Sequence, residues 1–281
     1  FIKNSSNSSG GAVAMITEFP YSGIYSTNCK FIENQAGGSG GAISGGSGGH
    51  TNSLFFKNVA NGDGGAFAMG NNGGTTITGC IFIQNESGGS GGAISHGVVN
   101  DNSNSNTLND CIFYKNTASS YGAAIKGSSS YQDAYKINLN NCLFYENNCL
   151  SPSNDGYIIY AGNYINTNNS YFFDTQNETD YSRLYNKVYG NGNIFKFNPN
   201  QIYAKYSGGT ASYDVTYNYW GNKDSTYIAS VIIDFFDDPD YNSPIADYTP
   251  FSMGPSPDVV GSPSSVTNLA IKVDSLYQTT Y

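Results

Sequence analysis

A two-part motif recurs along this sequence, and its spacing narrows the folds that the chain can adopt. The first part reads Cys-x-Phe-x-x-Asn and the second reads Gly-Gly-Ala-Ile, as at residues 80–85 and 91–94. The aromatic position of the motif recurs in steps of 23 to 31 residues, at Phe1, Phe31, Phe55, Phe82, Phe113, Phe144, Phe172, Phe195 and Trp220. Repeats of about 20–50 residues are typical of solenoids, propellers and arrays.

The apolar residues within each motif alternate, which is the period of a strand and not of a helix. Variable steps suit a coil whose loops change length while its strands stay in register. We therefore predict an all-β fold, a single-stranded right-handed parallel β-helix of about nine coils with a C-terminal cap and tail. Each coil should hold three short strands: the Cys-x-Phe strand, the Gly-Gly-Ala-Ile strand, and one with an L-x-I-like pattern, such as Ile137 and Leu139.

Equivalent positions of stacked coils lie one strand spacing apart, ~4.8 Å. The repeat therefore predicts three columns of like side chains. An aromatic column holds Phe31, Phe55, Phe82, Phe113 and Phe144; an asparagine column holds Asn34, Asn58, Asn85, Asn116 and Asn147; a cysteine column holds Cys29, Cys80, Cys111 and Cys142. We place the asparagines at a turn, where this residue tolerates left-handed dihedral angles, and the glycine pairs where a Cβ atom would clash.

The cysteine column has two interpretations, a metal or redox cluster and a column of small buried side chains. Zinc sites use close ligand pairs such as Cys-x-x-Cys, and none occurs here. We therefore favour buried thiols that pack as small apolar groups, and we expect no cofactor. Cys149 falls outside the column, and we expect it in a loop with an exposed thiol.

The composition limits the partners of the chain. Charged residues make up only 12%, and the formal net charge of −9 argues against nucleic acid and anionic membrane surfaces. No run of 18 apolar residues occurs, so we expect no membrane insertion. A polar, lysine-poor repeat is typical of exported proteins, which predicts an extracellular or cell-surface location. Because the sequence begins inside a repeat, we expect it to be part of a longer chain.

The sequence has a glycine-rich first part and a tyrosine-rich second part. Residues 1–127 hold 25 of the 34 glycines but only 4 of the 24 tyrosines. We predict one β-helix domain over residues 1–251, with regular Gly-rich coils at 1–127 and Tyr-rich, degraded coils and a cap at 128–251, because solenoids need a covered end. A Pro/Ser linker should follow at 252–265, and a further β segment should start at 266–281.

The paired peptides resemble those of a known family. The sequences FIKN, FIEN, FFKN, FIQN, FYKN and FYEN, together with GGAV, GGAI and GGAF, are similar to the F-x-x-N and G-G-A-[ILV] repeats of polymorphic outer membrane proteins. The ending NYWGN, IIDFFDD and ADYTPF resembles the closing coil of adhesin-like β-helix proteins. Both groups share the pectin-lyase-like β-helix, and the resemblance covers about residues 1–251. It implies a secreted or surface-exposed, adhesin-like module without catalysis.

The alternative is a carbohydrate-active enzyme, either a polysaccharide lyase or a hydrolase. A lyase needs calcium ligands and a base, and a hydrolase needs converging carboxylates. The richest acidic cluster consists of Asp234, Asp237, Asp238 and Asp240. We favour a solvated acidic turn here, and the alternative is a calcium site or a catalytic pair. His50 and His96 lie near loops, and we assign no catalytic residue.

Tyrosines in the second half of the chain form the candidate binding face. Sugars stack on flat aromatic surfaces, and tyrosine is frequent at interfaces. The candidates are Tyr171, Tyr181, Tyr185, Tyr189, Tyr213, Tyr217 and Tyr219. The alternative is that these rings pack within the degraded coils. The expected partners are glycans or surface proteins of a host or neighbouring cell, unless the module is a stalk.

Overall fold

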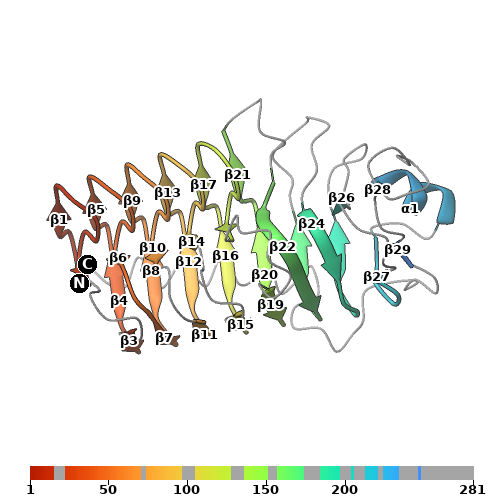
Figure 1. The fold of residues 1–281 in the computed structure, drawn as a ribbon, viewed down its shortest axis with the longest axis horizontal. Coiled ribbons are helices and arrows are strands. Elements are labelled where there is room, and N and C mark those ends of the chain that lie inside the picture. The colour runs from red at the N-terminus through yellow and green to blue at the C-terminus, as the bar shows by residue number, and fades with distance from the viewer. Residues whose placement is uncertain are drawn as a thin grey trace.

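The computed structural model describes residues 1–15, 23–70, 74–96, 105–127, 136–150, 157–173, 184–196, 204–205, 213–220, 224–233 and 246–247. These residues form short strands stacked in parallel along one axis, which Figure 1 shows as a rod that runs from β1 toward α1. The predicted parallel β-helix is confirmed. The expected linker at 252–265 and β segment at 266–281 lie outside the described residues.

Sheet A is built from the Cys-x-Phe parts of the repeat. Its seven strands are β4 (Lys30–Ile32), β8 (Leu54–Phe56), β12 (Ile81–Ile83), β16 (Ile112–Tyr114), β20 (Leu143–Tyr145), β23 (Tyr171–Phe173) and β25 (Ile194–Lys196). Adjacent strands pair in register, so that Phe82 lies between Phe55 and Phe113. The repeat therefore sets the register of the whole sheet.

Sheet B was not predicted. Its six two-residue strands follow the asparagines directly: β1 (Ser5–Ser6), β5 (Gln35–Ala36), β9 (Val59–Ala60), β13 (Glu86–Ser87), β17 (Thr117–Ala118) and β21 (Asn148–Cys149). Each regular coil among the described residues therefore has four short strands where we expected three. In Figure 1 sheet B forms one edge along the rod.

Sheet C contains two rows of strands. The first row, from the Gly-Gly-Ala-Ile motifs, comprises β2 (Val13–Ala14), β6 (Ile43–Ser44), β10 (Phe67–Met69), β14 (Ile94–His96) and β18 (Ile125–Lys126). The second row comprises β3 (Gly23–Thr27), β7 (Ser47–Thr51), β11 (Thr76–Thr78), β15 (Asn106–Asn109) and β19 (Lys136–Asn140). The rows meet at β22 (Ile159–Asn168), which pairs with both β18 and β19.

The regular part of the rod is shorter than predicted. Five turns among the described residues carry a strand in every row, so the expectation of about nine coils is too high. Beyond β22, sheet C continues through β24 (Leu184–Tyr189), β26 (Ala204–Lys205) and β28 (Ile232–Ile233). The remaining elements are α1 (Ser225–Val231) and the pair β27 (Tyr213–Asp214) and β29 (Ala246–Asp247). The described helix is too short to span a membrane.

The aromatic column extends beyond the five regular turns. Neighbouring rings from Phe1 to Trp220 stack with centroids 4.5–5.1 Å apart and planes within 16° of parallel. Phe31, Phe82 and Phe144 are buried, as are the other members between Phe31 and Trp220. Each stacked pair contributes about 0.5–1.5 kcal/mol beyond the burial of apolar area.

The asparagine column is a continuous hydrogen-bonded ladder. The side-chain oxygen of Asn85 accepts hydrogen bonds from the backbone and side-chain amides of Asn58, at 3.0 and 2.9 Å. Its side-chain nitrogen donates to Asn116 Oδ1 at 2.9 Å and to the carbonyl of Phe55 at 3.0 Å. The left-handed dihedral angle lies not at the asparagine, as we expected, but at the residue before it, as in Gln84 with φ 51°.

The glycine pairs allow close packing of successive coils. Gly64 has φ +71°, a left-handed conformation that favours glycine. At the next position, a Cβ atom on Gly65 would lie 2.1 Å from the carbonyl oxygen of Gly92 in the following coil. The first glycine therefore makes the turn, and the second lets the next coil approach.

Variation in coil length is concentrated at one edge, between the two rows of sheet C. Six residues separate each of β5, β9, β13 and β17 from the following first-row strand. By contrast, the rows are joined by two residues at 45–46, six at 70–75, and nine at both 97–105 and 127–135. We call this the insertion edge. It accounts for the variable steps of the repeat between Phe31 and Phe144.

Candidate functional site

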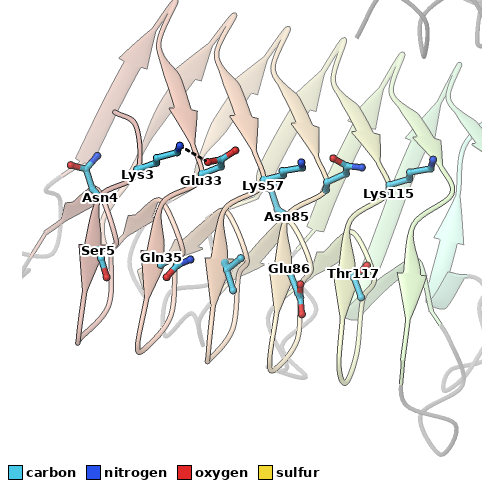
Figure 2. A pocket seen from close by; sticks show the side chains of 12 residues that line it. Lys3, Asn4, Ser5, Glu33, Gln35, Lys57, Asn85, Glu86, Lys115 and Thr117 are labelled. Atoms are coloured by element: carbon cyan, nitrogen blue, oxygen red, sulfur yellow. Dashed lines mark ion pairs between the residues drawn. The ribbon is translucent and has the colours of Figure 1, made fainter. Parts of the chain in front are cut away.

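An open groove follows the corner between sheets A and B along the rod. Its volume is about 740 Å³, and it extends over five coils, from Lys3 to Lys115. One wall carries the residues that precede the ladder asparagines: Lys3, Glu33, Lys57, Gln84 and Lys115. The other wall carries the first residues of the sheet B strands: Ser5, Gln35, Val59, Glu86 and Thr117. Figure 2 shows the labelled side chains in two lines. We call this hollow the corner groove.

The local sequence explains why these side chains face solvent. The phenylalanine, the asparagine and the second residue of the sheet B strand are buried, as for Phe55, Asn58 and Ala60. Two residues lie between the phenylalanine and the asparagine, and the second has φ of 51–54° at each coil of the groove. This left-handed residue bends the chain from sheet A into sheet B and directs its own side chain outward, as for Lys57 (Figure 2).

Lysines lie in alternate coils of the first wall. Lys3 forms an ion pair with Glu33 at 3.5 Å, and Lys115 forms one with Glu146, in the next coil, at 3.4 Å. Lys57 Nζ lies 5.1 Å from the ring centroid of Phe56. The pKa of Lys115 is raised chiefly by its hydrogen bond with Tyr114, so this ammonium group stays charged.

The groove does not bring Glu33 and Glu86 together as the carboxylate pair of a glycoside hydrolase. Glu33 and Glu86 lie on opposite walls two coils apart. Two strand spacings are ~10 Å before the width of the groove is added, whereas the carboxyl groups of glycoside hydrolases are about 5–10 Å apart. Among the residues whose placement is described, no group of three His, Cys, Asp or Glu side chains is arranged to hold a metal ion. Asp234, Asp237, Asp238 and Asp240 lie outside the described residues.

The predicted tyrosine face is not assembled by the described residues. Tyr171 is only 2% exposed and packs against Leu143, Tyr145 and Tyr219, so its proposed role on a binding surface is wrong. Tyr217 is 62% exposed and Tyr219 is partly buried. Backbone alone is described for the remaining candidates on strands, Tyr185, Tyr189 and Tyr213, and Tyr181 lies outside the described residues.

The cysteine position is occupied by small buried side chains along the rod, and three of its cysteines pack in the hydrophobic core. Cys80, Cys111 and Cys142 are buried free thiols, and burial raises the pKa of Cys80 to about 12. Ser170 accepts a hydrogen bond from the backbone of Cys142 at 3.0 Å, and Asn193 accepts one from Ser170 at 3.0 Å. Residues at the cysteine position therefore form hydrogen bonds with the equivalent residues of the neighbouring coil.

Two further residues bear on the sequence predictions. Cys149 lies in β21 with a buried thiol, so the expected exposed loop position is wrong. His50 is buried, and its Nδ1 atom lies 2.8 Å from Ser26 Oγ. Burial lowers the pKa of His50 to about 4. Its ring is enclosed by Phe55 and Phe67, which leaves no access for a substrate.

The sequence carries a signal for the corner groove. The four-residue units that support the family resemblance differ in their third residue, which is Lys, Glu or Gln. Only the left-handed φ at this position shows that these residues form one wall.

Comparison with known proteins identifies one coil. Residues 28–46 match the Chlamydia polymorphic membrane protein repeat. This segment contains one complete motif, from Cys29 through Asn34 to Ile43. The resemblance predicted from the sequence is therefore confirmed, with a parallel β-helix that carries this repeat. No curated protein and no solved structure matches the chain.

Proposed function

We propose that this chain is a non-catalytic, adhesin-like module on a cell surface, in which a rigid β-helix presents binding segments to glycans or proteins of another cell. The repeat match supports a surface location, because the matched family is named for a membrane protein. The rod itself is held by the ring column and the asparagine ladder, which leave its interior closed.

One observation carries the proposal: between Phe31 and Phe144, the segments that vary in length all enter at the insertion edge. Repeat proteins often place their binding residues in insertions on a single face. Because the strands keep their register on either side of residues 97–105, this insertion changes the surface without changing the scaffold. A stalk that served only as a spacer would not need such variation.

The test uses a short connection that the chain already contains. Replacing residues 97–105 by Gly-Gly copies the connection at 45–46 between β6 and β7. We expect this variant to retain the far-UV circular dichroism spectrum of the parent and to lose binding to cultured cells and to an array of glycans. A matched variant with Gly-Gly in place of residues 127–135 shows which insertion binds. Binding by both variants equal to that of the parent would contradict the proposal.

The enzyme alternative is tested in the same samples. Soluble polysaccharides are incubated with the chain, with and without calcium, and the products are analysed by mass spectrometry. The proposal predicts polysaccharide of unchanged length. Released oligosaccharides would support a lyase or hydrolase, and would direct mutagenesis to Asp234, Asp237, Asp238 and Asp240.

A further inference from the structure

We infer that the corner groove binds an extended acidic glycan with one carboxylate or sulfate group on every second sugar. The inference rests on the proposed function, to which it adds a second binding surface and a ligand class. This surface is separate from the insertion edge, because the groove lies between sheets A and B whereas the insertions join the two rows of sheet C.

The spacing of the lysines carries the argument. Lys3, Lys57 and Lys115 belong to coils one, three and five of the described rod, as the paired sheet B strands show. Stacked coils are ~4.8 Å apart, so an ammonium group recurs every ~10 Å along the groove. A sugar ring in an extended glycan spans about one strand spacing. The lysines therefore match anionic groups on alternate sugars.

The residues between the lysines disfavour a uniform polyanion. Glu33 and Gln84 occupy coils two and four of the same wall, and Glu146 continues the wall beyond Lys115. A chain with an anion on every sugar would place like charges against Glu33 and Glu146, which weakens binding. A neutral sugar at these positions offers hydroxyl or N-acetyl groups that carboxylate and amide side chains can bond.

The backbone of the groove favours a glycan over a peptide. Peptides that add to a sheet need unpaired backbone groups at an exposed strand edge. Here the backbone amides of Lys57 and Gln84 donate to Ile83 and Tyr114 of the following coils, at 3.0 and 2.9 Å. The amides of Val59 and Glu86 donate to Asn34 and Asn58 at 2.9 Å. The interior coils of the groove therefore present side chains to a ligand.

The lysines are accessible. The side chains of Lys3 and Lys115 are 63% and 41% exposed, whereas those of their partners Glu33 and Glu146 are 26% and 12% exposed. An anionic ligand can therefore reach these ammonium groups from the solvent side. The stacked rings of Tyr114 and Tyr145, with centroids 5.4 Å apart, adjoin this wall and offer an aromatic surface to a sugar face.

Three oligosaccharides of equal length distinguish the ligand classes by isothermal titration calorimetry. They are hyaluronan, with one carboxylate per disaccharide, oligogalacturonate, with one per sugar, and neutral N-acetylchitooligosaccharide. We expect the parent chain to prefer hyaluronan. The double variant Lys57→Gln/Lys115→Gln should bind it roughly tenfold more weakly, because two contacts with exposed charges are lost.

The chain offers matched controls. Lys30→Gln removes an exposed lysine from sheet A outside the groove and should leave hyaluronan affinity unchanged. Gln84→Lys puts three lysines in successive coils and should shift preference toward oligogalacturonate. These exchanges should preserve the fold, because Lys, Gln and Glu already occupy this left-handed position.

The inference is overturned if the parent binds none of the three oligosaccharides, if it prefers oligogalacturonate or the neutral chain, or if the double variant and Lys30→Gln bind hyaluronan equally. Its failure is distinguishable from failure of the proposed function. The variant shortened at residues 97–105 should lose adhesion to cells and retain hyaluronan affinity, whereas the double variant should lose hyaluronan affinity.

Discussion

The substitution Asn85→Ala tests whether the asparagine ladder holds the coils together. The side chain of Asn85 takes part in four buried hydrogen bonds that this change removes: two accepted from Asn58, one donated to Asn116 and one donated to Phe55. A buried hydrogen bond contributes about 1 kcal/mol net, so the expected loss is ~4 kcal/mol. The two amide hydrogens of Asn58 that lose their acceptor make this a lower estimate.

The matched control is Asn4→Ala at the exposed end of the same ladder. The Asn4 side chain donates one hydrogen bond, to Asn34 Oδ1 at 2.8 Å, and is solvent-exposed, so its loss should cost at most ~1 kcal/mol. Urea unfolding followed by far-UV circular dichroism measures both free energies of unfolding. Losses that agree within ~0.5 kcal/mol would refute the argument, since they would show that stability does not depend on the buried ladder.

Three other predictions concern groups buried in the rod. Since burial lowers the pKa of His50 from 6.5 to about 4, the unfolded state binds the additional proton between these values, and stability should fall as the pH drops from 6.5 to 4. Thermal melts across this range should show a smaller fall for His50→Leu, and an unchanged slope would contradict the prediction. The partly buried thiol of Cys29 should react with a thiol reagent in the native protein, whereas the thiol of Cys80 should react only after unfolding. An absorbance assay measures both reactions, and equal reaction rates of the two thiols in the native protein would contradict the prediction. Gly65→Ala should lower the free energy of unfolding in urea by about 3 kcal/mol, because its Cβ atom would clash with the next coil. Gly49→Ala should have a small effect, because the nearest atom to its Cβ would be Tyr25 Cδ1 at 3.4 Å. Similar losses of stability in the two variants would contradict this reasoning.

The strands with a repeated apolar signal could be predicted from the sequence. In successive coils the motif phenylalanine, such as Phe82, is followed by an asparagine three positions later. One strand register therefore aligns both the ring column and the asparagine ladder. Sheet B could not be predicted in this way. Its strands contain two residues, such as Gln35–Ala36, and two residues are too few to show an alternating pattern. Backbone pairing with the next coil defines them instead.

The candidate site was harder to predict than the fold. Tyrosine content suggested an aromatic face, but side-chain type does not determine exposure. Tyr171 packs among Leu143, Tyr145 and Tyr219, whereas Tyr217 is exposed. The corner groove instead depends on the left-handed conformation of residues such as Lys57. Lysine does not by itself favour that conformation, so its outward direction had to come from the three-dimensional structure.

The central claim about the corner groove is that it binds an acidic glycan without cleaving it. The most direct measurement incubates the purified chain with hyaluronan polymer, separates bound from free polymer by sedimentation, and determines the length of both by mass spectrometry after fixed times. The account predicts that polymer sediments with the parent chain, that the Lys57→Gln/Lys115→Gln variant retains less of it, and that its length does not change. Polymer shortened by the parent chain, or equal retention by both proteins, would contradict the account.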